Sequence, residues 1–319
     1  MISKGRACGK FILLGEHFVI SGEDGVAPVP ALAFPLHGLW CEVRVEPKPH
    51  PHYKAKLAHT EDRETIENLM ARATYAAASS LGLDISSQPL HVDSSANFPI
   101  SRGFGSSAAF AVALVRALDA FRKSITDRSA DWSELQKATS AVEHIFHGRP
   151  SGVDAAVILA GRAIRFEKGA VVRELKNNAV DFVLVDSGHR DNCAALVKEV
   201  VAFRERNAPQ WLRMATVLRQ LAEDTEAALA TGQAVIVAKA IDDTHGILAE
   251  LSLSSPAIEA IIKDGISNGA LAGKVSGAGG GGAVLLATAK GEGLRVAQAL
   301  RDAGRTVVGV DVANGAENG

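Results

Sequence analysis

A run of glycines between two apolar segments constrains this chain most. Five of the six residues 277–282 are glycine, and apolar residues on both sides predict buried strands at 272–276 and 283–289. The glycines satisfy GxGxxG, but a strand follows where a dinucleotide site needs a helix, so this is no Rossmann motif. GALAGKV (269–275) has neither the spacing nor the Ser or Thr of a Walker A sequence. We expect a tight turn that approaches another group closely, and the alternative is a turn that binds nothing.

Strands and helices alternate along the rest of the chain without a repeat of fixed period, which predicts an α+β or α/β protein. Further strands are predicted at 7–14, 39–46, 90–94, 162–166, 181–186 and 306–311. Helices are predicted at 64–81, 107–122, 131–146, 152–160, 191–206, 209–230, 233–250, 256–268 and 292–303. The polar stretches 46–53 and 167–179 are expected to be loops, and the second places a domain boundary near residue 179.

Composition excludes several classes of function. The chain has 319 residues and is 47% hydrophobic, which suffices for a sizeable core and two domains. The 34 Lys and Arg against 36 Asp and Glu leave no basic excess for a nucleic acid, and no window approaches the roughly 18 apolar residues of a membrane span. The N-terminus does not resemble a cleaved signal peptide, and three cysteines far apart argue against a disulfide framework. We therefore expect a cytoplasmic protein without nucleic-acid or membrane partners.

The segment PISRGFGSSAAFAVALVRAL (99–118) places glycines and small residues directly before a helix. Gly103 and Gly105 let the backbone approach a ligand, and the first N–H groups of a helix suit an anion. We expect a phosphate cradle here. The alternative is that Ser106 or Ser107 merely caps the helix. A GxSxG nucleophile elbow is excluded, because an alanine stands where its last glycine belongs.

Two carboxylates flank the helix break in AVEHIFHGRPSGVD (141–154). Glu143 lies near the end of one helix and Asp154 in the first turn of the next, so a helical hairpin could bring them to one spot. One would then hold a metal and the other a hydroxyl. Ser151 and Asp154 also have the spacing of a capping box, an alternative that stays open. The histidines of this segment lack the spacing of a zinc motif.

Charged residues also stand at both ends of an apolar strand in GKFILLGEHFVI (9–20). Lys10 enters the strand, and Glu16 and His17 follow it. Such residues lie at the rim of a sheet, where sites often form, although solvated strand ends explain the pattern equally well.

Three motifs in order, GKFILLGEH (9–17), GFGSSAA (103–109) and KVSGAGGGG (274–282), resemble those of the GHMP small-molecule kinases. Within that family, HGRPSGVD (147–154) resembles the mevalonate kinases. The resemblance implies an α+β fold of two domains, with the active site in the cleft between them. Residues 1–179 would form an N-terminal, ribosomal-protein-S5-like ATP-binding domain, and residues 180–319 a C-terminal, ferredoxin-like α/β domain. It also implies an enzyme that uses ATP and Mg²⁺ to phosphorylate the 5-hydroxyl of (R)-mevalonate.

The resemblance assigns roles to individual residues. Asp154 would be the catalytic base and Lys10 would lie near the reacting hydroxyl. Ser107 and Glu143 would hold Mg²⁺. The backbone around the ATP phosphates would be that of Gly103, Phe104, Gly105, Ser106, Ser107 and Ala108. The residues at the substrate would be Lys10, Glu16, His17, Ser151, Asp154, Gly277, Ala278 and Gly279.

The chain departs from the family pattern at several positions. Arg149 replaces an Asn and Phe104 a Leu, and Ser187 and Cys193 stand where the family often has Thr. The alternatives within the fold are a kinase for phosphomevalonate, a sugar or homoserine, or a non-catalytic sensor. The sequence does not fix the oligomeric state, and a homodimer is compatible with it.

Overall fold

The computed structural model describes residues 2–19, 29–56, 63–98, 102–188 and 193–313 of the chain. These residues belong to two compact units. Unit 1 comprises Met1–Gly9, Leu39–Ser101 and Gly105–Gly161, and unit 2 comprises Lys10–Gly38, Arg102–Phe104 and Arg162–Gly319. The two long strands β1 (Ser3–Leu14) and β2 (Ala31–Pro47) pair with each other and contribute residues to both units. A domain division of the sequence near residue 179 stays a prediction.

The sheet of unit 1 contains both an antiparallel and a parallel strand pair. The second half of β2 pairs antiparallel with β4 (Leu90–Ala96), and β3 (His52–Lys56) pairs parallel with β4. Apolar and charged residues alternate in this half of β2, so Val43 and Val45 are fully buried on one face. This alternation is typical of a sheet with one covered and one wet face.

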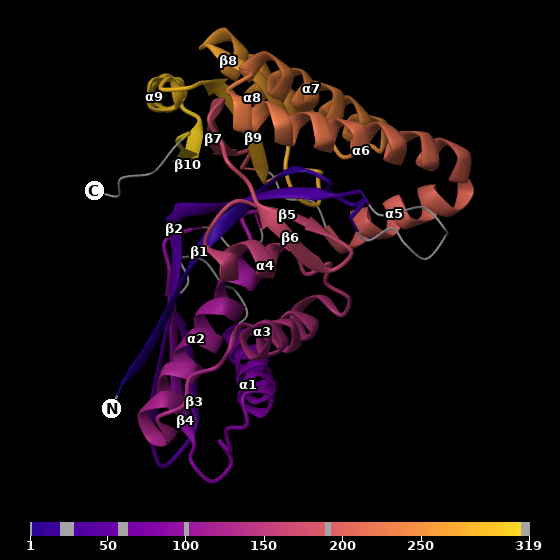
Figure 1. Ribbon diagram of the computed structural model, residues 1–319. Coiled ribbons are helices and arrows are strands. Elements are labelled where there is room, and N and C mark those ends of the chain that lie inside the picture. The colour runs from indigo at the N-terminus through magenta and orange to yellow at the C-terminus, as the bar shows by residue number, and fades with distance from the viewer. Residues whose placement is uncertain (1, 20–28, 57–62, 99–101, 189–192, 314–319) are drawn as a thin grey trace. The chain divides into compact units, whose positions relative to one another are not determined.

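Four helices complete unit 1: α1 (Arg63–Ser80), α2 (Ser106–Thr126), α3 (Trp132–His147) and α4 (Val153–Ala160). Helix α2 packs against α1, α3 and α4, and its small apolar residues are buried almost without interruption (Figure 1). Strand β1 also comes close to α2 at Gly5, where a Cβ atom would lie 2.0 Å from the carbonyl oxygen of Ala113. Small residues on both elements therefore bring α2 close to its neighbours.

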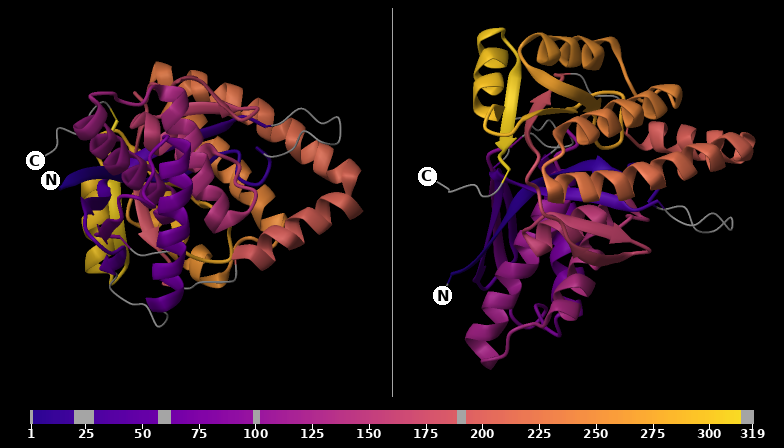
Figure 2. Two further views of the ribbon diagram at one scale, coloured as in Figure 1. Left: turned by 90° about the horizontal axis from the view of Figure 1, so that it is seen from below. Right: turned by 45° about the horizontal axis from the view of Figure 1, so that its top comes forward.

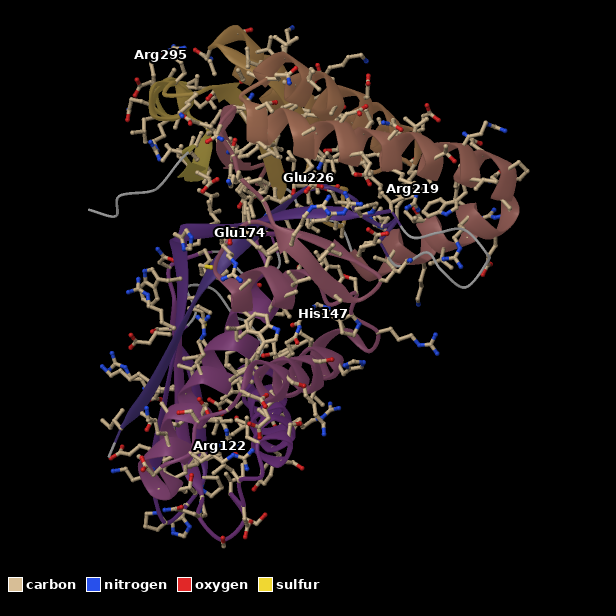
Figure 3. All side chains as sticks on the ribbon, in the orientation of Figure 1. Arg122, His147, Glu174, Arg219, Glu226 and Arg295 are labelled. Atoms are coloured by element: carbon tan, nitrogen blue, oxygen red, sulfur yellow. The ribbon has the colours of Figure 1, made fainter. Side chains whose placement is uncertain are left out.

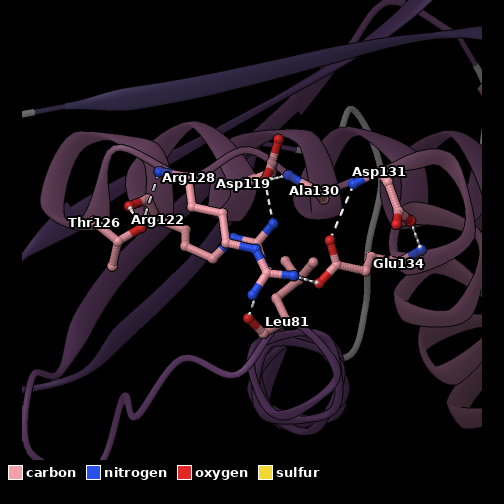
Figure 4. A network of polar contacts seen from close by, with 8 residues as sticks. All are labelled: Leu81, Asp119, Arg122, Thr126, Arg128, Ala130, Asp131 and Glu134. Carbon is pink, nitrogen blue, oxygen red and sulfur yellow. Dashed lines mark hydrogen bonds and ion pairs between the residues drawn. The ribbon is translucent and has the colours of Figure 1, made fainter.

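A buried arginine joins three helices of unit 1 (Figure 4). Arg122 of α2 donates to the carbonyl of Leu81, just after α1, at 3.1 Å. It also donates to Asp119 at 3.1 Å and to Glu134, in the first turn of α3, at 3.4 Å. Glu134 completes a capping box with Asp131 at the start of α3. The guanidinium thus fixes the end of α1 and the start of α3 on α2.

Unit 2 contains a four-stranded antiparallel sheet in the order β10-β7-β9-β8. Its strands are β7 (Val180–Asp186), β8 (Ala270–Val275), β9 (Ala283–Ala289) and β10 (Thr306–Asp311). Helices α7 (Ala234–Glu250) and α8 (Pro256–Ser267) pack against β8, and α9 (Gly293–Asp302) packs against β7 and β10 (Figure 2). Because β7 lies inside the sheet and under helices, Val180–Val185 are buried without alternation.

The remaining elements of unit 2 are β5 (Ile164–Glu167), β6 (Ala170–Glu174), α5 (Cys193–Arg206) and α6 (Ala208–Thr231). The first half of β2 pairs antiparallel with β5. Arg165 of β5 is buried and binds Glu223 at 2.6 Å and Glu226 at 2.9 Å, both on α6, where Figure 3 labels Glu226. Arg173 of β6 also pairs with Glu226. This ion-pair network holds the β5–β6 hairpin on α6.

A buried carboxylate at the start of β7 binds backbone N–H groups at the start of α9 and after β10. Asp181 of β7 accepts hydrogen bonds from the backbone N–H groups of Gly291, Gly293 and Ala313 at 2.9 to 3.0 Å. Burial, with the nearby Asp181 as a second cause, raises the pKa of the Asp311 carboxyl to about 7. The chain beyond β10 is therefore attached to β7 through the side chain of Asp181, which accepts from the N–H of Ala313.

The helices agree closely with those expected from the sequence. Each lies within two residues of its predicted ends, except that α2 runs four residues further, to Thr126, and that residues 191–192 of the prediction lie outside the described part. One strand prediction and two loop predictions are wrong, and β1 begins at Ser3, four residues before its expected start. Strand β2 begins at Ala31, because a proline inside it disguises an extended segment, and the expected loops at 46–53 and 167–179 contain the start of β3 and all of β6.

Within the described residues, no helix has both the length and the apolar character that crossing a bilayer requires. Two of the cysteines are described with their side chains, and both are free thiols. Burial raises the pKa of Cys41 to about 12, so this thiol is unreactive at neutral pH.

Candidate active site

Two glycines build the turn that leads into α2. Gly103 and Gly105 have φ angles of 86° and 78°, in the region that favours glycine. Gly105 is the N-cap, and no side chain caps the first turn of the helix. The interpretation that Ser106 or Ser107 is the cap is therefore wrong. The start of α2 presents backbone N–H groups and the positive end of the helix dipole, an arrangement that suits a phosphate.

A hydroxyl on α2 contacts the last turn of α3 within unit 1. Ser107 Oγ is 2.8 Å from Nε2 of His147, which Figure 3 labels in the last turn of α3. Glu143 is one helical turn before His147, hence on the same face of α3, and is 3% exposed. Hydroxyl and carboxylate oxygens are ligands that Mg²⁺ prefers. That Ser107 and Glu143 bind Mg²⁺ stays a prediction, and such a site would be completed by other ligands.

Among the described residues, no three or more His, Cys, Asp and Glu side chains are grouped so as to hold a metal. Mg²⁺ in phosphoryl-transfer enzymes is commonly bound by one or two carboxylates together with substrate phosphates, so a small donor set is sufficient.

Helix α4 starts without a capping box. Its N-cap is Gly152, with a φ of 84°, and no side chain caps the helix. Ser151 Oγ accepts instead from the N–H of Val153 at 3.4 Å. The capping-box interpretation of Ser151 and Asp154 is therefore wrong. Asp154 lies in the first turn of α4 and is half-buried, and no side-chain cap hydrogen bond forms at this helix start.

Two charged residues at the ends of the apolar part of β1 are buried in unit 2. Lys10 is 2% exposed and Glu16 is 3% exposed, so the expectation of solvated strand ends is wrong for both. The backbone N–H of Lys10 donates to the carbonyl of Phe104 at 3.0 Å. This hydrogen bond joins the first motif to the turn that precedes α2.

His17 follows in a strained conformation. Its φ of 59° is seldom adopted by a residue with a side chain. Its Nε2 lies 3.2 Å from the carbonyl oxygen of Ala278, in the glycine-rich turn. Burial lowers the pKa of His17, and the charge of Glu16 only partly offsets this effect. A neutral imidazole thus links the first motif to the third.

Glu16 forms an ion pair that the sequence analysis missed. The Lys274 ammonium contacts Glu16 Oε1, and both side chains are buried. Burial lowers the pKa of Lys274, while the charge of Glu16 opposes that effect. The available signal was the charge of Lys274 inside a strand expected to be buried, since a buried lysine requires a partner.

The glycine-rich turn lies between β8 and β9, as predicted, and approaches its neighbours closely. A Cβ atom at Gly279 would lie 2.7 Å from Leu253 Cβ, and one at Gly282 would lie 2.7 Å from the carbonyl oxygen of Arg102. Both glycines also have positive φ. The N–H of Gly280 donates to the carbonyl of Leu253 at 2.8 Å. These contacts explain why side chains are absent here.

Ser187 supports the same turn from the end of β7. Its N–H donates to the carbonyl of Gly282 at 2.8 Å, and its Oγ accepts from the N–H of Gly282 at 2.8 Å. Asp186 before it pairs with Arg102 at 3.7 Å. The side chain of Cys193 lies outside the described part of the chain, so its comparison with the family pattern stays open.

The candidate site residues fall into two sets, one in each unit. Unit 1 holds Gly105, Ser106, Ser107, Ala108, Glu143, Ser151 and Asp154. Unit 2 holds Lys10, Glu16, His17, Gly103, Phe104, Gly277, Ala278 and Gly279. Within unit 2 the structure brings all three motifs into contact, because the turn at Gly103 also packs against the carbonyl of Ser276.

Two family models match the chain. That of the GHMP kinases N terminal domain matches residues 68–162, and that of the GHMP kinases C terminal region matches residues 225–306. Together they cover more than half of the chain. The mevalonate kinase of Arabidopsis thaliana is 25% identical over 88% of this chain and 89% of its own length. That of Thermococcus gammatolerans is 27% identical over 94% of this chain and 93% of its own length.

Solved structures show the same fold. The L. major mevalonate kinase in complex with R-mevalonate superposes with a TM-score of 0.81 at 21% identity, covering 98% of this chain and 97% of that one. The Streptococcus pneumoniae phosphomevalonate kinase with phosphomevalonate and AMPPNP gives 0.77 at 16% identity, covering 97% and 99%. With both family models matched in order and the three motifs in place, the chain belongs to the GHMP kinase family.

Proposed function

We propose that this kinase transfers the γ-phosphoryl group of ATP to the primary 5-hydroxyl of (R)-mevalonate, which yields 5-phosphomevalonate and ADP. The observation that supports this substrate most is the similarity to curated mevalonate kinases over about nine tenths of the chain. The geometry within each unit agrees with it: an uncapped helix start for phosphate, an oxygen donor pair for Mg²⁺, and buried cationic and imidazole groups beside an apolar strand.

Two residues are proposed to act at the reacting hydroxyl. The transition state of phosphoryl transfer is loose, so alignment and charge stabilisation contribute more than early proton removal. Asp154 accepts the proton of the hydroxyl as the new oxygen–phosphorus bond forms and the bond to the ADP oxygen breaks. Lys10 supplies a fixed positive charge for the transferring phosphoryl group. Because Lys10 is buried, its charge is screened less by water than that of a surface lysine.

ATP is proposed to bind at the start of α2. The backbone of 103–108 surrounds the phosphates, and the N–H groups at the helix start donate to their oxygens. Ser107 and Glu143 would hold Mg²⁺, which would supply positive charge to neutralise the phosphates. The contact of Ser107 with His147 orients the hydroxyl before nucleotide binds.

The substrate pocket is proposed to match a short branched acid. Mevalonate has one carboxylate, one methyl group and no ring, so it needs one or two cationic or donor groups and an apolar surface. Lys10 and His17 are the polar groups, and the buried side chains of Phe18 and Val19 are the apolar ones. Ile20, which was also expected here, lies outside the described residues. A sugar would require several more polar side chains to pair its hydroxyl groups.

Phosphomevalonate is the rival substrate. It would need a further cation for its phosphate, and Arg149, exposed between α3 and α4, is a cation that the family pattern lacks at this position. The fold also matches a phosphomevalonate kinase nearly as well as a mevalonate kinase.

ADP release with a panel of alcohols tests the proposal. We expect kcat/KM with (R)-mevalonate to exceed that with phosphomevalonate, galactose or homoserine by at least ~10²-fold, or about 3 kcal/mol of transition-state binding. Asp154→Asn should abolish the signal and the exposed Asp224→Asn should not, which excludes a contaminating kinase. If phosphomevalonate is preferred and Arg149→Asn weakens that preference, the mevalonate assignment is wrong and the kinase assignment stands.

Three broader expectations belong to the same proposal. The protein would act in the cytoplasm, since cysteines without a disulfide, such as Cys41, suit a reducing compartment. A domain boundary near residue 179 would separate ATP-binding from C-terminal functions. A homodimer would leave the reaction unchanged, and light scattering of the purified protein would detect it.

A further inference from the structure

A buried ion pair fastens the first motif to the third inside unit 2. The Lys274 ammonium in β8 contacts Glu16 Oε1 and lies 3.4 Å from the carbonyl oxygen of Ile12. Ser276 adds two hydrogen bonds to Ile12: its Oγ accepts from the N–H at 3.3 Å and donates to the carbonyl at 3.0 Å. The strand that ends in Glu16 and His17 is thus held on the strand that enters the glycine-rich turn.

This ion pair is poorly explained as a stabilising device. Taking two charges out of water is costly, and well-packed apolar residues in their place are often as stabilising or more so. Lys274 is 0% exposed, and burial lowers its pKa. Within the described residues, Glu16 Oε2 is buried without a hydrogen-bond partner. The charges therefore have a positional role that an apolar pair would not perform.

The group next to the ion pair is His17. Glu16 precedes it directly, and the strained φ of His17 points its ring to the carbonyl oxygen of Ala278. A carbonyl oxygen only accepts, so Nε2 of His17 must carry the proton. Lys274 holds Glu16, the residue before His17, and the carbonyl of Ala278 accepts from the His17 ring. Together these contacts fix the orientation and tautomer of the imidazole.

Lys10 is the second neighbour. Its positive charge is close enough to Lys274 to lower the pKa of that lysine. Lys10, Glu16 and Lys274 are all buried, and Glu16 contacts Lys274. If Lys274 lost its charge, Glu16 would remain as an uncompensated buried anion, and Lys10 would be the nearby cation to neutralise it.

We propose that Lys274 is a positioning residue of this kinase, which holds Glu16 so that His17 meets Ala278 and Lys10 stays available to the phosphoryl group. The inference rests on the proposed function for its kinetic readout. It gives Glu16 a role through Lys274, in place of the direct substrate contact that the resemblance implied. Lys274 itself is 0% exposed, so it acts through Glu16.

Lys274→Met tests the proposal, with Lys239→Met in the exposed pair to Asp243 as the matched control. Because a small misplacement of catalytic groups is costly, we expect kcat to fall about 10²-fold while KM for ATP stays within about 3-fold. The double variant Glu16→Gln/Lys274→Met removes the stranded carboxylate that attracts Lys10. It should regain at least about 10-fold in kcat over Lys274→Met, a coupling that independent losses would not give.

Two outcomes overturn the proposal: a kcat of Lys274→Met within about 3-fold of wild type despite a lower melting temperature, or a double variant slower than the single one. If Lys274→Met does not fold, the comparison of Glu16→Gln with the double variant tests the proposal instead. Neither of these variants leaves a buried carboxylate without its partner. Because Lys274 acts through Glu16, Glu16→Gln should be about 10-fold slower than wild type and the double variant should lie within about 3-fold of Glu16→Gln; a wild-type rate for Glu16→Gln would refute the positioning role.

A spectroscopic readout separates this inference from the proposed function. Wild-type protein that releases no ADP with any alcohol would overturn the mevalonate assignment alone. Nitrogen-15 spectra of labelled histidine would then decide about Lys274. The protonated Nε2 signal of His17, assigned by its loss in His17→Gln, should disappear or shift in Lys274→Met. An unchanged signal would show that Lys274 does not position His17.

Discussion

Protonation of Asp311 links the stability of unit 2 to pH. Its pKa is raised from 3.8 to about 7, first by burial and then by the charge of Asp181. Between these two values the folded protein binds a proton that the unfolded chain has released, so the free energy of unfolding falls as pH rises from about 4 to 7. The full difference would correspond to about 4 kcal/mol. Because Asp311 is only half-buried, screening by water reduces the expected loss to about 1–2 kcal/mol.

Urea denaturation between pH 4.5 and 8 measures this loss. The fluorescence of Trp211, which stacks on Phe18 with ring centroids 3.9 Å apart, reports on unit 2. Asp311→Asn should flatten the decline in unfolding free energy by about 1–2 kcal/mol, because an amide does not titrate. The exposed Asp302→Asn should retain the wild-type slope. If Asp311→Asn keeps that slope as well, burial of the Asp311 carboxyl is not what couples stability to pH.

Three further substitutions test the site and the fold. Asp154→Asn should lower turnover by ~10²-fold or more without lowering the melting temperature, and unchanged turnover would remove Asp154 as the base. Glu143→Gln should raise the Mg²⁺ concentration needed for half-maximal rate, and an unaltered magnesium titration would take Glu143 out of the ligand set. Arg122→Met should cost about 3 kcal/mol of unfolding free energy in urea, because Asp119 and Glu134 lose a buried partner; a loss below about 1 kcal/mol would contradict the network.

The helices were predictable because local signals mark their ends. Helix α3 starts at the capping box of Asp131 and ends before Gly148, and α8 starts after Ser255 with a proline in its first turn. Such caps depend only on residues a few positions apart, so a single sequence displays them. The start of α4 is an exception, since Gly152 and not Ser151 is its N-cap.

The missed strands lack such local signals. Strand β6 is short and mostly exposed, so its residues show no apolar face, and only its pairing with β5 makes it a strand. Strand β2 contains Pro35, which argues against a strand when it is taken alone. Pairing partners that are distant in sequence decide both cases, and no local pattern reveals them.

In the candidate site, too, local backbone features were predictable and contacts between distant residues were not. The glycines at 277–282 indicated a close backbone approach, and the structure supplies the neighbours, Leu253 and Arg102. The pairing of Glu16 with Lys274 joins residues 258 positions apart, so the sequence showed two separate charges and not their contact. A glycine indicates the backbone conformation at its own position. A buried charge indicates only that a partner is needed and does not identify that partner.

Phosphorus-31 NMR of the reaction product tests the central claim most directly. With ATP, Mg²⁺ and (R)-mevalonate, the account predicts a new phosphomonoester signal that is split into a triplet by the two protons of the adjacent CH₂ group, which assigns the ester to the primary 5-hydroxyl. With Asp154→Asn the signal should appear ~10²-fold more slowly. No new ester from mevalonate, together with a diphosphate signal from phosphomevalonate, would contradict the account.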